Sequence, residues 1–297
     1  MAPDAPTKPL RILMLHGYTQ SGPMFRIKTR ALEKNLSKHF PAGLELVYPT
    51  APIHLSKADI PTWDQTSVSA NASFNNDSLA AEPEEEKPDA WSWWRRKGDA
   101  EPYRYEGIEI GLGKIAEVLK EQGPFDGVIG FSQGAAAAGM LASLLEEGRR
   151  EAFEKAQANG GMRYPECFEE DSGYVTDTIH PPLKFAVSYC GFGAPNPLYQ
   201  AFYDPVIKTP MMHFIGSVDT VVEEKRSLLL VNACDGLETA DKAKETGRLV
   251  YHPGGHYLPS SQPQYLGALV TFLKEAMAGG KQEKPEEEKA EDMDVPF

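Results

Sequence analysis

The chain has 297 residues, of which 41% are hydrophobic, and it carries a formal net charge of −13. This length and hydrophobic fraction suit one sizeable α/β domain with a substantial core. More than half of the negative charge lies in two acidic runs, residues 82–89 and 281–297, and this acidic balance argues against nucleic acid as a partner.

The N-terminal residues 1–8 contain Pro, Asp and Lys in place of an apolar run, which predicts a flexible N-terminus without a secretory signal. No stretch approaches the roughly 20 apolar residues of a membrane span. The three cysteines, Cys167, Cys190 and Cys234, offer no disulfide framework, so we expect a reduced compartment, the cytoplasm and also the nucleus. No metal-ligand or phosphate-loop spacing stands out, and neither a metal nor a cofactor is expected.

The first elements expected along the chain are two strands. A buried strand, Leu10–Leu15, runs into His16-Gly17-Tyr18, and a second strand covers residues 44–48. Residues 49–107 then show no strong helical or strand period before an expected helix over 108–120. A gap of this length in a compact domain is usually a functional lid or partly disordered. We expect an acidic loop insertion at about residues 65–90.

The same segment is rich in tryptophan. These side chains either line or cover a pocket, or pack on the core beside Tyr103 and Tyr105, because aromatic rings bury large areas anywhere. The residues concerned are Trp63, Trp91, Trp93 and Trp94. The neighbouring run Arg95-Arg96-Lys97 is either a docking spot for an anionic carrier or a solvated face.

The pentapeptide Gly130-Phe131-Ser132-Gln133-Gly134 carries the strongest signal for function. It fits G-x-S-x-G, follows an apolar run over 125–129 that predicts a buried strand, and precedes an alanine-rich helix over 135–145. This is the strand–turn–helix context that a nucleophile elbow needs. Glycines flank the serine because side chains there would collide with the neighbouring strand and helix. The pattern predicts that Ser132 is the nucleophile of an acyl-transfer enzyme.

A second insertion, at about residues 148–182, separates this helix from a strand over 183–189. Residues 151–157 favour a helix. In related folds this position often holds a cap over the acyl site, and four side chains are candidates for contact with a substrate. They are Phe153, Met162, Tyr164 and Phe168. No residue is assigned to substrate binding from the sequence.

A serine nucleophile needs a general base and a carboxylate that orients it. The strand Met211–Gly216 leads to Asp219, at the strand end where open α/β sheets place their chemistry. A strand over 248–251 leads to His252-Pro253-Gly254-Gly255-His256. We expect Asp219 as the acid and His256 as the base, since a loop tip beyond two glycines reaches the nucleophile and His252 is held by local packing.

Other acidic residues are less well placed. Asp204 and Asp235 lack a comparable strand before them, and Asp126 is expected at the opposite end of the sheet. A strand that ends in His-Gly commonly supplies one backbone N–H to an oxyanion hole, and the residue after the nucleophile supplies the other. This assigns the main chains of Tyr18 and Gln133, with His16 bracing the loop.

The last expected element is a helix over 264–277 with an apolar stripe, followed by an acidic disordered tail over 280–297. The order of elements predicts an α/β fold with a mostly parallel central sheet, helices on both faces and lid-like insertions, all within residues 9–279.

These motifs together resemble the FSH family of serine hydrolases, small enzymes of the α/β-hydrolase superfamily. The resemblance rests on Leu15-His16-Gly17-Tyr18, on residues 123–135, on Gly216-Ser217-Val218-Asp219 and on residues 252–256. It implies the α/β-hydrolase fold, a triad of Ser132, Asp219 and His256, and hydrolysis of carboxylic esters or thioesters. Some relatives release acyl chains from fungal polyketide synthases.

The expected function is therefore a serine esterase that cleaves small or medium acyl substrates through an acyl-enzyme. A thioesterase that releases carrier-bound or coenzyme A-bound acyl chains is the alternative, with an acyl carrier as partner. A non-catalytic binding protein with the same fold is the third hypothesis, and an intact nucleophile, acid, base and oxyanion hole argue against it.

Overall fold

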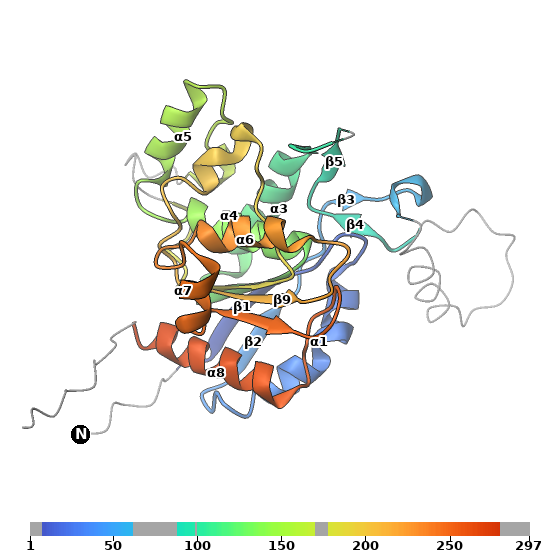
Figure 1. Ribbon diagram of the computed structural model, residues 1–297, viewed down its shortest axis with the longest axis vertical. Coiled ribbons are helices and arrows are strands. Elements are labelled where there is room, and N and C mark those ends of the chain that lie inside the picture. The colour runs from blue at the N-terminus through green and yellow to red at the C-terminus, as the bar shows by residue number, and fades with distance from the viewer. Residues whose placement is uncertain (1–7, 62–87, 99, 170–177, 280–297) are drawn as a thin grey trace, which may run out of the picture.

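The computed structural model describes residues 8–61, 88–98, 100–169 and 178–279 (Figure 1). Its centre is a six-stranded sheet in the order β10-β9-β8-β7-β1-β2, in which every neighbouring pair is parallel. The strands are β1 (Leu10–Leu15), β2 (Leu44–Val47), β7 (Gly127–Phe131), β8 (Phe185–Tyr189), β9 (Met211–Gly216) and β10 (Leu249–His252). The expected α/β class with a parallel central sheet is confirmed.

Helices cover both faces of this sheet (Figure 1). One face carries α1 (Gly22–Leu36) and α8 (Pro263–Met277), and the other carries α3 (Ile108–Gln122), α4 (Gln133–Leu144) and α6 (Glu224–Asn232). Two further helices are α5 (Arg149–Gln157) and α7 (Ala240–Glu245). No helix among the described residues is long and apolar enough to cross a membrane.

The central strands are apolar along their whole length because both of their faces are buried. In β1, Ile12 and Met14 pack in the cluster that contains the apolar side chains of α1 and α8. Leu13 and Leu15 pack in the cluster on the opposite face, with α3 and α4. Alternate side chains of one strand thus pack into two separate cores, one on each face of the sheet.

Helix α4 lies in the middle of the second core, and all of its residues are buried. It therefore shows no amphipathic stripe. The alanines at 135–138 keep its surface small, which lets the helix lie close to β7 and β8. This explains why the sequence after Ser132 is rich in alanine.

Residues 49–107 contain more regular structure than the sequence predicts. Strand β3 (Ile53–His54) pairs antiparallel with β4 (Trp91–Ser92), and β5 (Arg95–Lys97) pairs antiparallel with β6 (Arg104–Glu106). Strands of two or three residues are too short to produce a visible period. Trp63, most of the acidic loop at 65–90, residues 1–7 and the tail 280–297 lie outside the described residues.

The second insertion does not cover the site around Ser132 in its described part. Phe153 on α5 and Phe168, in a 3-10 turn at Glu166–Phe168, are fully buried in the core, and Tyr164 donates a hydrogen bond to the Leu144 carbonyl at 2.7 Å. Phe153 and Phe168, two of the four candidates for contact with a substrate, are core residues and do not line the cleft around Ser132. Since α4 begins beside Ser132, the chain that follows its end lies at the far side of the core.

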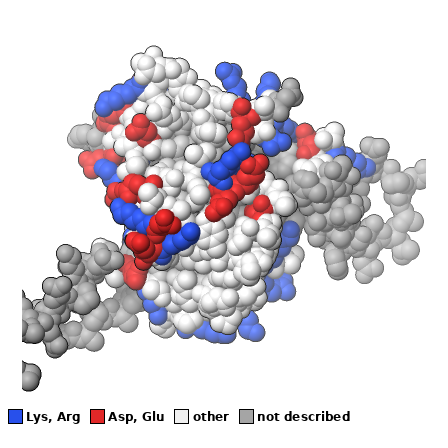
Figure 2. Space-filling view, in the orientation of Figure 1, with Lys and Arg blue, Asp and Glu red and all other residues white. Residues whose placement is uncertain are grey.

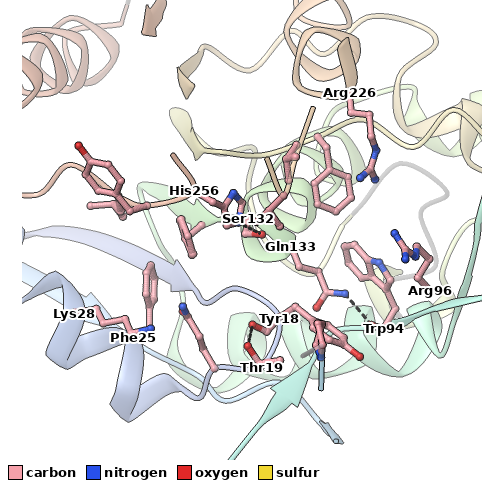
Figure 3. Close-up of a pocket in the computed structure, with 18 of the residues that line it drawn as sticks. Tyr18, Thr19, Phe25, Lys28, Trp94, Arg96, Ser132, Gln133, Arg226 and His256 are labelled. Atoms are coloured by element: carbon pink, nitrogen blue, oxygen red, sulfur yellow. Dashed lines mark hydrogen bonds between the residues drawn. The ribbon is translucent and has the colours of Figure 1, made fainter. Parts of the chain in front are cut away.

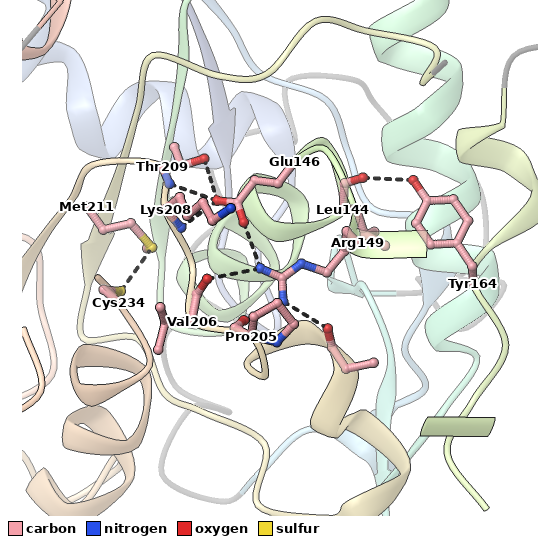
Figure 4. A network of polar contacts seen from close by, with 11 residues as sticks. Leu144, Glu146, Arg149, Tyr164, Pro205, Val206, Lys208, Thr209, Met211 and Cys234 are labelled. Carbon is pink, nitrogen blue, oxygen red and sulfur yellow. Dashed lines mark hydrogen bonds and ion pairs between the residues drawn. The ribbon is translucent and has the colours of Figure 1, made fainter. Parts of the chain in front are cut away.

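A buried ion pair between Glu146 and Arg149 lies just beyond the end of α4 (Figure 4). The Arg149 guanidinium lies 2.7 Å from the Glu146 carboxylate and donates to the carbonyls of Ala201, Pro205 and Val206. The second Glu146 oxygen accepts hydrogen bonds from the Lys208 amide and from the amide and hydroxyl of Thr209. The network fastens the end of α4 to the segment that leads into β9.

Candidate active site

Ser132 occupies the turn between β7 and α4 in a conformation that is rare for a residue with a side chain, φ 54° and ψ −117°. A Cβ on Gly130 would lie 2.2 Å from the Gly134 carbonyl oxygen, and a Cβ on Gly134 would lie 2.1 Å from the Leu15 carbonyl oxygen. Neither position accepts a side chain without backbone movement. The tight, glycine-flanked turn expected from the pentapeptide is present.

The structure brings the three predicted catalytic side chains together in one hydrogen-bonded row. The His256 Nε2 atom lies 2.8 Å from the Ser132 hydroxyl oxygen, and the His256 Nδ1 atom lies 2.7 Å from Asp219 Oδ2. Because a carboxylate accepts at Nδ1, that nitrogen carries the proton of the neutral ring and Nε2 accepts from the serine hydroxyl. This is the tautomer that a general base needs.

The Asp219 carboxylate is held from both sides. Its Oδ1 atom accepts hydrogen bonds from the amides of Val221 and Val222 at 2.8 and 2.9 Å, while Oδ2 faces His256. Its side chain is only 3% exposed. Burial by itself would raise the pKa of Asp219, but the hydrogen bond and charge of His256, together with the two amides, keep the pKa below its usual value. The residue therefore stays ionised near neutral pH.

The loop between β10 and α8 positions His256. The Gly254 carbonyl accepts a hydrogen bond from the Val218 amide, and the His256 ring lies 5.1 Å from the Phe131 ring, centroid to centroid. His252 is buried at the strand end against the rings of Tyr257 and Tyr265, as expected for a packing residue.

The rival carboxylates lie elsewhere. Asp126 accepts from the Arg11 amide and pairs with Lys184 at the other end of the strands, and Asp204 and Asp235 are exposed. None of the three is in contact with His256. Asp219, which follows β9, is the carboxylate that contacts His256, as predicted from the sequence.

The loop after β1 lies directly against the nucleophile. A Cβ on Gly17 would come within 2.9 Å of the Phe131 ring and 3.3 Å of Ser132 Cβ. The buried His16 ring accepts the Ala51 amide at Nε2 (2.9 Å), so Nδ1 carries the proton and donates to the Gly17 carbonyl at 2.8 Å. Burial lowers the pKa of His16 to about 4, so the ring stays neutral and braces the loop.

Tyr18 and Gln133, the two expected oxyanion donors, both line the cleft beside Ser132. Among the described residues, the structure gives no acceptor to either backbone N–H. Gln133 is also the first residue of α4, where backbone N–H groups lack partners within the helix. The geometry therefore leaves both amides available to an oxygen of a bound substrate.

The Gln133 side chain has a role that the sequence did not reveal. Its amide oxygen accepts from the Trp93 backbone N–H at 2.9 Å. Its NH₂ group donates to the Trp94 carbonyl at 2.7 Å, as Figure 3 shows. We call these two contacts the Gln133 bridge. In addition, the Trp93 indole N–H donates to the His16 carbonyl at 2.9 Å. The nucleophile turn, the β1 loop and the tryptophan segment are thereby fixed to one another.

Both alternatives for the described tryptophans are realised, by different residues. Trp93 is fully buried and packs on the His16 ring, whereas Trp94 stacks on Tyr105 with ring centroids 5.0 Å apart and also lines the cleft. Trp91 is half-buried and donates from its indole to Asp89 at 2.7 Å.

The cleft around Ser132 has a volume of about 1210 Å³. Ser132 and His256 lie between two arms of it (Figure 3). One arm contains Phe25 and Lys28 of α1, and the other contains Trp94, Arg96 and Arg226. A cleft of this size accommodates a substrate considerably larger than acetate on either side of the serine.

One group of potential metal ligands occurs among the described residues. Single ligand atoms of Cys190, Asp219 and His256 lie within 4.8 Å of one another. Two of these side chains already hydrogen-bond each other, so an ion bound there would replace the contact that orients His256. Burial raises the pKa of the Cys190 thiol to about 12, followed in importance by the charge of Asp219, which makes Cys190 a poor nucleophile.

Comparison with known proteins places the chain among hydrolases. A family model described as serine hydrolase (FSH1) matches residues 5–266. The chain is 32% identical over 257 residues to family of serine hydrolases 3 of Saccharomyces cerevisiae, covering 85% of this chain and 79% of that protein. It is 31% identical over 261 residues to esterase OVCA2 of Danio rerio, covering 85% and 92%.

A third relative is considerably longer. A Schizosaccharomyces pombe protein named dihydrofolate reductase is 32% identical over 269 residues, which cover 90% of this chain and 47% of the relative. The chain thus spans about half the length of that protein.

Solved structures support the fold. Acyl-protein thioesterase 2 of Zea mays superposes with a TM-score of 0.52 at 17% identity, covering 93% of this chain and 97% of that chain. Esterase PE8 superposes with a TM-score of 0.50, also at 17% identity, covering 93% and 96%. Given the family match over most of its length, this chain belongs to the FSH1 family of serine hydrolases and has the α/β-hydrolase fold.

Proposed function

We propose that this serine hydrolase cleaves carboxylic esters of acyl substrates through a Ser132–His256–Asp219 triad and an acyl-enzyme. The observation that carries the proposal is the continuous row of hydrogen bonds from Asp219 through His256 to the Ser132 hydroxyl, with contacts of 2.7 and 2.8 Å. Each residue comes from the carboxyl end of a different strand, which is where this fold assembles its chemistry.

In the first step His256 Nε2 removes the proton of Ser132 while the hydroxyl oxygen attacks the carbonyl carbon of the ester. The imidazole becomes a cation, which the Asp219 carboxylate stabilises at Nδ1. His256 then gives its proton to the leaving alcohol as the carbon–oxygen bond breaks. In the second step His256 takes a proton from water while the water oxygen attacks the acyl carbon. His256 then gives that proton to the Ser132 oxygen as the ester bond to the serine breaks and the acid is released.

The negative charge that develops on the substrate oxygen is assigned to the backbone amides of Tyr18 and Gln133. Loss of one such donor costs about 100- to 1,000-fold in turnover in other serine hydrolases. The neutral His16 ring and the Gln133 bridge hold the two amides against Ser132. These supports belong to the machinery as positioning residues, because they touch no reacting atom.

The same triad accepts thioesters chemically, and an acyl thioesterase that acts on carrier-bound or coenzyme A-bound chains is the alternative substrate class. The decisive experiment is hydrolysis of a series of straight acyl chains, each offered as a matched oxyester and thioester. A clear optimum in chain length would measure how long an acyl chain the cleft accommodates. The ratio of kcat/KM for the thioester to kcat/KM for the oxyester of the same chain would assign the substrate class.

Two variants control this experiment. Ser132→Ala removes the nucleophile and should abolish turnover while the fold is retained, as measured by circular dichroism. Asp219→Asn keeps the shape but favours the wrong histidine tautomer, and we expect kcat to fall by about 1,000-fold or more. Wild-type turnover in the Ser132→Ala variant would refute the mechanism, and labelling of the wild type by a fluorophosphonate, absent in that variant, would support it.

A further inference from the structure

The cleft has a charge opposite to that of the whole chain. Among the described residues, four cationic side chains line it, Lys28, Arg95, Arg96 and Arg226, together with one carboxylate, Asp59. The chain as a whole carries −13. On the outer face shown in Figure 2, in contrast, acidic and basic side chains lie beside one another. Positive charge is therefore concentrated where the substrate binds.

Arg95 and Asp59, two of these lining residues, contact each other. Arg95 lies 3.5 Å from Asp59 and donates to the His54 carbonyl at 2.9 Å, so it holds β5 to the neighbouring loop. This pair accounts for the only carboxylate that lines the cleft among the described residues. Arg226 has a separate ion-pair partner, Glu101, which does not line the cleft.

Arg96 and Arg226 are both held by aromatic rings. The Arg96 guanidinium lies over the Tyr103 ring at 4.4 Å, and the Arg226 guanidinium lies over the Phe192 ring, also at 4.4 Å. Within the described parts of the chain, no carboxylate forms an ion pair with Arg96. A guanidinium fixed on a ring loses less side-chain freedom when it binds a ligand than a mobile one does.

Arg226 is the more deeply placed of the two, with its side chain 13% exposed. Its Nε atom lies 3.0 Å from Glu101. Burial raises the pKa of Tyr105, another residue of the cleft wall, and the positive charge of Arg226 partly opposes this rise. Figure 3 shows Arg226 and Arg96 on the same side of Ser132 as Trp94. Two cations from distant segments, β5 and α6, thus line the same arm of the cleft.

We propose that Arg96 and Arg226 bind a negatively charged group of the substrate, a carboxylate or a phosphate that is separate from the scissile carbonyl. The inference rests on the proposed ester or thioester hydrolysis and names its substrate class: anionic acyl esters or thioesters. A simple neutral ester offers no anion to Arg96, which has no ion-pair partner among the described residues, and none to Arg226, whose described ion-pair partner is Glu101.

The test compares two pairs of substrates that differ in charge. The first pair is p-nitrophenyl hexanoate and mono-p-nitrophenyl adipate, in which the acyl end gains a carboxylate. The second is hexanoyl-N-acetylcysteamine and hexanoyl-coenzyme A, in which the leaving group gains phosphates. We expect the charged member of at least one pair to be preferred about tenfold in kcat/KM, as for a partly exposed charge-assisted contact. The pair that shows the preference identifies the source of the charge.

The variants Arg96→Gln and Arg226→Gln should each lower kcat/KM for the charged member by a larger factor than kcat/KM for the neutral member, and so remove most of this preference. Arg226→Lys should restore part of it, since the charge is kept. Arg104→Gln is the matched control, because Arg104 is an exposed cation on the adjacent strand β6 and does not line the cleft. High salt should weaken the preference in the wild type.

Two results would overturn the inference: equal kcat/KM within both pairs, or variants that lose turnover of neutral and charged substrates by the same factor. Either result leaves the proposed function intact as long as Ser132-dependent turnover of a neutral substrate is observed. Absence of Ser132-dependent turnover of all four compounds would instead count against the proposed function.

Discussion

Replacement of Arg149 by methionine tests whether the buried ion pair stabilises the fold without taking part in catalysis. The Arg149 side chain is 1% exposed and pairs with Glu146 at 2.7 Å. Methionine fills a similar volume along the aliphatic part but supplies no charge and no donor. The Glu146 carboxylate would keep its contacts to Lys208 and Thr209 and lose its only counter-charge among the described residues.

The expected cost is large because a buried charge is left uncompensated. Removal of one partner of a buried ion pair costs about 3–5 kcal/mol in unfolding free energy. Glu146→Gln is the matched variant, since its amide oxygen still accepts from the Thr209 amide. In the double variant the unpaired carboxylate is gone, so the two single losses should not add, and a coupling of about 1–3 kcal/mol is expected.

Catalysis should be unaffected in the folded fraction. Glu146 follows the end of α4, which begins beside Ser132, and a rise of about 1.5 Å per residue places the ion pair roughly 20 Å from the nucleophile. Urea unfolding followed by tryptophan fluorescence gives the free energies, and ester hydrolysis below the transition gives kcat. A fall in kcat at unchanged stability would refute the reasoning, as would strictly additive single effects.

Two further perturbations address the site and the response to pH. Gln133→Met breaks the Gln133 bridge and leaves the buried Trp93 amide without its acceptor. We expect a loss of about 1–3 kcal/mol in unfolding free energy and a lower kcat at unchanged KM. An unchanged kcat would show that the bridge does not position the oxyanion donors. Burial lowers the pKa of His16 to about 4 and that of His213 to about 3. Below pH 6.5 the unfolded chain binds protons that the folded chain does not, so stability should fall from pH 6.5 to 4 by up to about 1.4 kcal/mol per pH unit for each histidine. His213→Leu should reduce the slope of unfolding free energy against pH, and an identical slope would contradict the assignment.

Sequence patterns predicted the central strands because both their faces are buried and their apolar runs are continuous. β1 and β9 have the predicted bounds, and β2, β8 and β10 differ by one or two residues. The strand before the nucleophile lies two residues later than predicted, at Gly127–Phe131. Its last residues, Gly130 and Phe131, belong to the pentapeptide. Glycine is uncommon in strands and therefore did not predict one here, but position 130 must be glycine because the start of α4 lies too close for a side chain.

The proposed triad was accessible from sequence for a different reason. Each member follows a strand of one parallel sheet, and the carboxyl ends of parallel strands meet at one edge, so position in the chain implies position in space. The contacts of the Gln133 side chain follow no such rule. They depend on how residues 91–94, which enter the fold through the short strand β4, lie against the nucleophile turn.

The walls of the cleft come from segments whose placement the sequence did not predict, and this separation has a functional consequence. Trp94, Arg96 and Tyr105 all belong to residues 49–107, whereas the described part of the insertion at 148–182 contributes no lining residue. The proposed triad depends on the ends of central strands, which tolerate little change because both cores pack on them. The part of the cleft wall that contains Trp94, Arg96 and Tyr105 depends on the short peripheral strands β5 and β6 and the residues beside them, where substitutions alter the substrate-binding surface and leave the central sheet intact. Exchange of Arg96 should accordingly change substrate preference at constant stability, whereas changes at Gly130 or Gly134 should prevent folding before they affect preference.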